Sequence, residues 1–159
     1  MCINRNNDPT RDGNVKSGDK PNRRIHSITS FASCELRLSG MREISIFVIE
    51  PQGESANLSL YRPDFASKER DARILEERVT CPLEKMIALF NDCNVLKWDG
   101  FDGPHPKGLL DGTMFRFQLD LGDGRVVTAH GSQNFPSHFH DLTAGLYAIF
   151  REQGKDGHL

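Results

Sequence analysis

The pattern of apolar and polar positions in the first half of the chain is that of short β-strands. In the segment Ser33–Ser39, apolar residues alternate with charged or polar ones, so one face of a strand would be buried. The segment 64–78 is more charged and could form an exposed helix. We favour an edge strand over residues 73–79, because charged side chains also protect a sheet edge from pairing with another chain. The strands predicted in this half cover residues 33–39, 43–50, 57–62 and 73–79.

Two segments instead space their apolar residues as an amphipathic helix does. The first begins at Pro82, a residue that suits the first turn of a helix. Its apolar stripe consists of Leu83, Met86, Ile87 and Phe90. The second helix is predicted to begin near Pro136 or Ser137 and to end before Gly154. Its apolar stripe consists of Phe139, Leu142, Leu146, Ile149 and Phe150.

Between the two helices the chain predicts a β-hairpin. Apolar and polar residues alternate over residues 114–121, and residues 125–130 return as the second strand. Gly122 and Gly124, on either side of Asp123, can adopt the positive φ angles that a tight turn requires. The apolar face of the first hairpin strand consists of Phe115, Phe117, Leu119 and Leu121.

The order of these elements predicts an α+β fold. We expect an antiparallel sheet (three or four strands, then a helix, a hairpin and a helix) with the two helices packed on one face. We assign residues 30–153 to this single domain. Residues 1–29 are expected to be a disordered polar tail and residues 154–159 a disordered C-terminus. Such polar segments bury too little apolar surface to offset the entropy lost on ordering.

The distribution of charge argues against a nucleic-acid-binding protein. Residues 1–29 carry six basic and three acidic side chains, a net charge of +3, and the rest carries 14 basic and 19 acidic ones, a net charge of −5. Nucleic-acid-binding domains usually carry a clustered basic face. No stretch approaches the roughly 18 consecutive apolar residues of a membrane span, and the first residues lack the apolar segment of a secretory signal. We therefore expect a soluble, cytoplasmic protein.

The four cysteines lie far apart in the sequence and form no C-x-x-C pair. Zinc sites and redox motifs both depend on closely spaced thiols, so neither is indicated. Cys81 and Cys93 lie on either side of the first predicted helix and are expected to be small buried residues. We predict no cofactor.

Turn-forming residues concentrate between Cys93 and Pro136, a region that holds the only tryptophan and half of the glycines. It contains the motifs W-D-G-F at 98–101, L-D-G at 110–112 and G-S-Q-N-F-P at 131–136. These motifs resemble those of a group of small bacterial proteins, in which a W-[DN]-G-F turn follows a helix and a G-S-N-x-[FY]-P turn precedes the last helix. The resemblance covers roughly residues 80–152 and implies an α+β fold and a bacterial or phage origin, but no established reaction or ligand. The chain departs from the second motif by having Gln133 between Ser132 and Asn134.

We predict that this region is the working surface of a non-enzymatic interaction module, because aromatic residues beside Gly, Pro and Asp suit a protein-binding rim. The expected partner is a protein or a second copy of the chain. Trp98 could instead anchor the loop in the core, and Phe135 could staple the start of the last helix. The surface would comprise the loop 98–110 and the turn 131–135, with the residues Trp98, Asp99, Phe101, Asp102, His105, Lys107, Asn134 and Phe135.

The alternative function is a metal-assisted hydrolase, which would need histidine and carboxylate ligands gathered at one end of the sheet. Against this alternative, the spacing matches no known metal motif, and Asp-Gly steps are primarily turn formers. Ser132 beside His130 suggests a nucleophile and a base, but no acid is placed to orient the histidine. The candidate metal ligands are His105, His130, Asp102 and Asp111.

Overall fold

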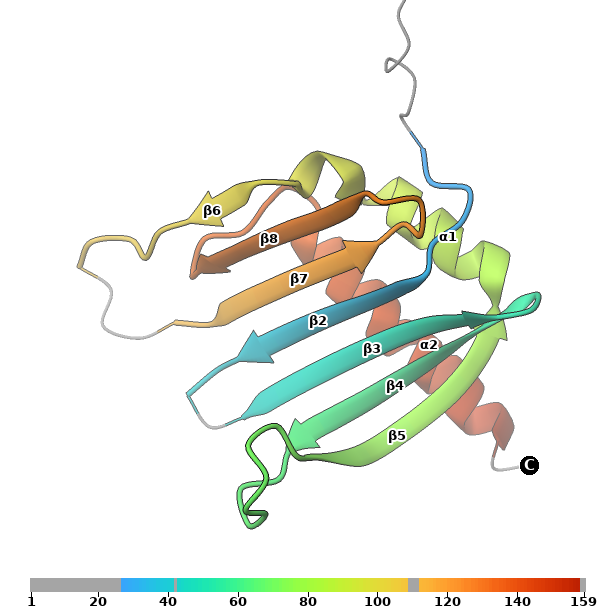
Figure 1. The fold of residues 1–159 in the computed structure, drawn as a ribbon, viewed down its shortest axis with the longest axis horizontal. Coiled ribbons are helices and arrows are strands. Elements are labelled where there is room, and N and C mark those ends of the chain that lie inside the picture. Colours follow the sequence, from blue (N-terminus) through green and yellow to red (C-terminus); the bar gives the residue numbers. More distant parts are fainter. Residues whose placement is uncertain (1–26, 42, 109–111, 158–159) are drawn as a thin grey trace, which may run out of the picture.

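The computed structural model describes residues 27–41, 43–108 and 112–157. In these residues, seven strands form one mixed sheet in the order β5-β4-β3-β2-β7-β8-β6 (Figure 1). The strands are β2 (Ser33–Ser39), β3 (Ile44–Gln52), β4 (Ser55–Pro63), β5 (Arg73–Pro82), β6 (Phe101–Gly103), β7 (Met114–Asp120) and β8 (Val126–Ser132).

The expected antiparallel sheet of three or four strands, followed by a helix and a hairpin, is wrong. Strand β2 pairs with both β3 and β7, so the strands of the two halves form one continuous sheet. Leu36 of β2 accordingly lies between Phe47 of β3 and Phe117 of β7. The three-residue strand β6 pairs parallel with β8 and makes the sheet mixed. A strand this short shows no alternating pattern, so the sequence did not predict it.

The apolar pattern predicted the individual strands and helices better than it predicted which strands pair with each other. The strand at 33–39 is confirmed, and so is the charged edge strand, which the structure extends to Pro82. Helix α1 (Leu83–Asp92) begins directly after that residue. Helix α2 (Phe139–Gly157) continues past Gly154, where its end was expected.

The core lies between one face of the sheet and a layer of helices. Figure 1 shows α1 and α2 on the same side of the sheet, and a 3-10 helix, η3 (Val95–Trp98), leads from α1 to β6. Phe47 of β3 packs against Tyr147 and Phe150 of α2, at ring-centroid distances of 5.4 and 6.2 Å. Among the described residues, no helix is both long enough and apolar enough to span a membrane.

The segment before β2 is attached to the helical layer. Residues 1–26 of the expected tail lie outside the described residues, but Ile28, which we also assigned to the tail, belongs to the core and is 4% exposed. Its N–H donates to Oδ1 of Asn91 over 2.7 Å, and its carbonyl oxygen accepts from Nδ2 of the same residue over 3.0 Å. The first residue of β2 and the end of α1 are thus linked through a short, anchored segment that starts before residue 30.

Three cysteines are buried within this fold. The burial of Cys81 and Cys93 was predicted from their positions beside α1 and is confirmed, and Cys34 is buried in β2. Burial raises the pKa of the Cys93 thiol to about 11, with a smaller contribution from nearby carboxylates. The thiol therefore stays protonated at neutral pH, as expected of a packing residue.

Candidate functional site

The loop and the turn predicted to form a binding surface lie side by side at the β6 edge of the sheet (Figure 1). Nδ2 of Asn134 donates to the carbonyl oxygen of Pro104 over 3.4 Å, and Nδ1 of His105 lies 2.8 Å from Oγ of Ser132. These hydrogen bonds join residues that are 30 and 27 positions apart. We call residues 99–108 and 131–135 of these two segments the loop–turn surface.

Close backbone packing holds the turn against the sheet. Gly103 of β6 and Gly131 of β8 are paired in the parallel register. A Cβ atom on Gly103 would lie 2.5 Å from the carbonyl oxygen of Asn134, and a Cβ atom on Gly131 would lie closer still to that oxygen. Glycine is therefore required at both positions, because any side chain would displace the turn.

Gln133 connects the turn 131–135 to the start of β7. Its φ of 50° lies in the left-handed region. Its N–H donates to the carbonyl oxygen of Thr113, and its Oε1 accepts the N–H of the same residue, both over 2.7 Å. The sequence did not predict this role, because Thr113 lies 20 positions away along the chain.

Trp98 lies in the core and is therefore removed from the predicted surface. The residue is only 2% exposed, and its Nε1 donates to the carbonyl oxygen of Ser137 over 3.0 Å. Its ring packs edge-on against Phe117 at a centroid distance of 4.9 Å. The alternative interpretation, in which this tryptophan anchors the loop, describes the observed arrangement, and burial of so large a ring stabilises the loop.

Phe101 and Phe135 are half-buried, and each ring packs against another aromatic ring of the fold. The ring of Phe101 lies 6.1 Å from that of Phe115, and the ring of Phe135 is stacked on Phe139 at 4.7 Å. Since Phe139 is the first residue of α2, Phe135 packs where the predicted staple of the last helix would lie. The two rings connect the surface to the core and leave part of their own area accessible.

The exposed polar residues of the surface have different roles. Oδ1 of Asp99 accepts the N–H of Thr128 over 3.0 Å, so this carboxylate helps to hold the loop on β8. Asp102 lies opposite His130 in the register of β6 and β8, and its Oδ1 lies 3.6 Å from Nδ1 of the histidine. The side chain of Asp102 is 72% exposed, and Lys107 is exposed as well. The surface thus presents acidic, imidazole and cationic groups to solvent.

The alternative metal site is not assembled by the described residues. Asp102 contacts His130, whereas His105 is hydrogen-bonded to Ser132, and Asp111 lies outside the described residues. Within residues 27–41, 43–108 and 112–157, no group of three or more His, Cys, Asp or Glu side chains could hold a metal ion. The proposed ligands therefore form pairs with different partners rather than one coordination sphere.

A second feature, on the face of the sheet opposite the helices, was not predicted. Arg37 of β2 and Arg116 of β7 lie directly opposite each other there. The alternating pattern places each arginine on the polar side of its own strand. Only the pairing of β2 with β7 brings them together, and no local pattern in the sequence predicts that pairing.

Neither the topology nor the layer arrangement specifies a function, since one fold commonly serves many. The distinguishing features of the molecule are the loop–turn surface at one edge of the sheet and the opposed arginines on the face opposite the helices. Comparison of the chain with protein-family models, with curated proteins and with solved structures yields no significant match.

Proposed function

We propose that the protein is a non-enzymatic interaction module that binds a protein partner through the loop–turn surface. The observation that carries this proposal is the pair of hydrogen bonds that join the loop to the turn, from Asn134 to Pro104 and between His105 and Ser132. Segments fixed in this way lose little conformational entropy when a partner binds, so more of the contact energy contributes to affinity.

The composition of the surface supports a protein partner. Half-buried aromatic rings, Phe101 and Phe135, lie in the same two segments as exposed polar groups, and protein interfaces commonly combine an aromatic centre with a polar rim. Asp102 and Lys107 supply charges of opposite sign on the same loop, which suits recognition of a mixed-charge partner surface.

The test is a triple substitution, Asp102→Ala with His105→Ala and Lys107→Ala, in the full chain. Tagged wild-type and triple-variant proteins are used to capture partners from an extract of the source organism, followed by quantitative mass spectrometry and measurement of affinity with the purified partner. We expect binding to weaken by at least about tenfold, because losses of about 0.5 kcal/mol at each of three rim side chains together exceed about 1.4 kcal/mol.

The matched control replaces Lys68, Glu69 and Arg70 with alanine. These residues are exposed in the loop between β4 and β5, at the β5 edge of the sheet, opposite to the β6 edge where the loop–turn surface lies (Figure 1). The control variant should bind as the wild type does, and both variants should retain the wild-type melting temperature to within a few degrees. If the first variant binds its partner as tightly as the wild type, the interaction surface lies elsewhere.

A further inference from the structure

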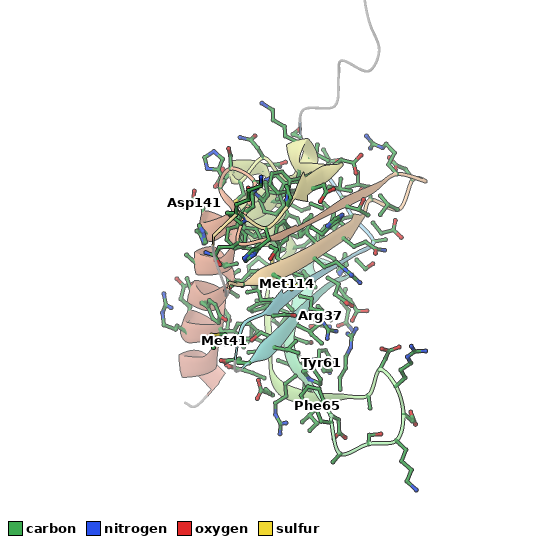
Figure 2. The ribbon with its side chains drawn as sticks, turned by 90° about the vertical axis from the view of Figure 1, so that its left-hand side faces the viewer. Arg37, Met41, Tyr61, Phe65, Met114 and Asp141 are labelled. Atoms are coloured by element: carbon green, nitrogen blue, oxygen red, sulfur yellow. The ribbon has the colours of Figure 1, made fainter. Side chains whose placement is uncertain are left out.

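The face of the sheet opposite the helices has its own layer of side chains. Figure 2 shows Arg37 and Tyr61 projecting from the side of the sheet that faces away from α2. Ile46 belongs to this face, since it alternates with Phe47, which contacts α2. It is nevertheless only 1% exposed, and its paired neighbours are Arg37 on one strand and Tyr61 on the other. We call this the open face.

The open face is hollowed over its central strands. Arg73 of the edge strand β5 reaches across β4 and β3 to Glu35 of β2, and the two side chains form an ion pair of 3.1 Å. The guanidinium carbon of Arg73 also lies 5.8 Å from the centre of the Tyr61 ring. Beside this bridge is a hollow of about 270 Å³, whose lining includes Glu35, Arg37, Val48, Glu50, Arg116 and Gln118.

Two arginines in this hollow lie side by side, and no carboxylate of the described residues forms an ion pair with either of them. Arg37 and Arg116 are directly opposed on antiparallel strands, a position in which Cα atoms lie about 4.5–5.5 Å apart. Their guanidinium groups have no ion-pair or hydrogen-bond partner in the described part of the chain. Like charges in directly opposed positions destabilise a sheet, so this pair is unfavourable unless an anion is present.

Other arginines of the same sheet do have partners. Arg73 is paired with Glu35, and Arg62 is paired with Glu76 at 3.2 Å. Arg78 donates from Nε to Oγ of Ser59 over 2.8 Å and from Nη2 to the hydroxyl of Tyr61. The carboxylate of Glu35 is therefore already engaged with another cation, and the hollow keeps a local excess of positive charge at its β2–β7 side.

We propose that this hollow binds a small molecule through a carboxylate or phosphate group held between Arg37 and Arg116. Guanidinium groups bind both kinds of anion in a bidentate manner, and two of them from adjacent strands would hold one group from both sides. The volume lies just below the usual range of ligand pockets, about 300–1,000 Å³, which favours a small metabolite. Further along the strands, Gln118 of β7 and the carboxylate of Glu50 of β3, which forms no ion pair with the described residues, favour hydroxyl or amino groups in the rest of the ligand.

The test uses the full chain, labelled with ¹⁵N, and follows the Nε–H resonances of its arginines by NMR. Inorganic phosphate and succinate are titrated separately into the millimolar range at constant ionic strength. We expect the resonances of Arg37 and Arg116 to shift and saturate with at least one anion. The anion with the lower Kd distinguishes a phosphate ligand from a carboxylate ligand.

Variants identify the residues responsible. Arg37→Gln and Arg116→Gln should each weaken binding by at least about tenfold, because each removes charge-assisted hydrogen bonds to the anion. Arg116→Lys keeps the charge but loses the bidentate geometry, so it should bind with intermediate affinity. Arg151→Gln, an exposed arginine on α2, is the matched control and should bind as the wild type does.

The same spectra report whether each variant is folded, so loss of binding is separable from loss of structure. The proposal is overturned if neither anion gives a saturable shift with the wild type. It is equally overturned if folded Arg37→Gln and Arg116→Gln proteins bind as tightly as the Arg151→Gln control. Because these residues lie outside the loop–turn surface, either outcome leaves the proposed protein interaction to its own test.

Discussion

Gly131 of β8 closely approaches the carbonyl oxygen of Asn134, a residue three positions further along the chain. A Cβ atom at this glycine would overlap with that oxygen and would also lie 2.8 Å from Cε1 of Phe115. The lack of a side chain at residue 131 therefore allows both the path of the turn 131–135 and the packing of this turn on the sheet. The loop–turn surface depends on this close approach, since the hydrogen bond from Asn134 to Pro104 forms only when the turn is in place.

Gly131→Ala is expected to lower the free energy of unfolding by at least about 2 kcal/mol, because the added methyl group meets backbone that cannot move without disturbing the turn. Urea unfolding followed by circular dichroism measures the change. Gly40→Ala is the control, since the nearest atom to its Cβ would be 3.7 Å away. Equal stabilities of the two variants would contradict the proposed packing.

Arg116→Gln is expected to raise the free energy of unfolding by about 0.5 kcal/mol in the absence of ligand, because it removes a like-charge pair from opposed positions. The gain should shrink at high ionic strength, since salt screens the repulsion. A double-mutant cycle with Arg37→Gln, measured by urea unfolding, separates the repulsion from other effects of each substitution. Additive effects of the two substitutions would mean that the arginines do not repel each other.

Much of the fold could be predicted from the sequence, and what could not be predicted is non-local. Alternation along Ser33–Ser39 is a property of consecutive residues, and that strand was predicted at its correct bounds. The pairing of this strand with Met114–Asp120 depends on contacts between distant segments, which no local pattern records. The strand Phe101–Gly103 was missed for another reason: its Asp-Gly step is typical of a turn, and pairing with β8 overrides that preference.

For the candidate site, too, the local features were predicted and the long-range contacts were not. The grouping of turn-forming residues predicted the two segments of the loop–turn surface, but not the contacts between them. His105 was considered as a metal ligand, whereas it is hydrogen-bonded to Ser132 from the other segment. Trp98 shows that composition alone does not separate an exposed aromatic residue from a buried one, because both occur beside glycine and aspartate. The pairing of Arg37 with Arg116 could not be predicted without knowing the order of the strands in the sheet.

The stability of the protein is expected to fall at alkaline pH, in part through Cys93. Its pKa is about 11 in the folded protein and near the ordinary value of 9.0 in the unfolded chain, because burial disfavours the thiolate. Between about pH 9 and pH 11 the unfolded chain therefore releases the thiol proton while the folded protein retains it. The unfolded state then binds fewer protons, so the free energy of unfolding decreases as the pH rises.

Urea unfolding of the wild type and of Cys93→Ala, at pH 7.5 and at pH 10, measures this contribution. The substitution is expected to cost some stability at both values, since it removes a buried sulfur atom. The loss between the two pH values should be smaller in the variant than in the wild type. A loss of the same size in both proteins would show that the alkaline dependence arises from other groups.

The central position of β2 has a consequence for the order in which the chain folds. Ser39 pairs on one side with Ile44 and on the other with Met114. The first contact closes a short turn, whereas the second brings together residues about 75 positions apart, which costs more loop-closure entropy. Topologies with such distant contacts fold slowly. We therefore expect the meander from β2 to β5 and the hairpin of β7 and β8 to form early, and the docking of β7 on β2 to be the late step that commits the chain to its native state.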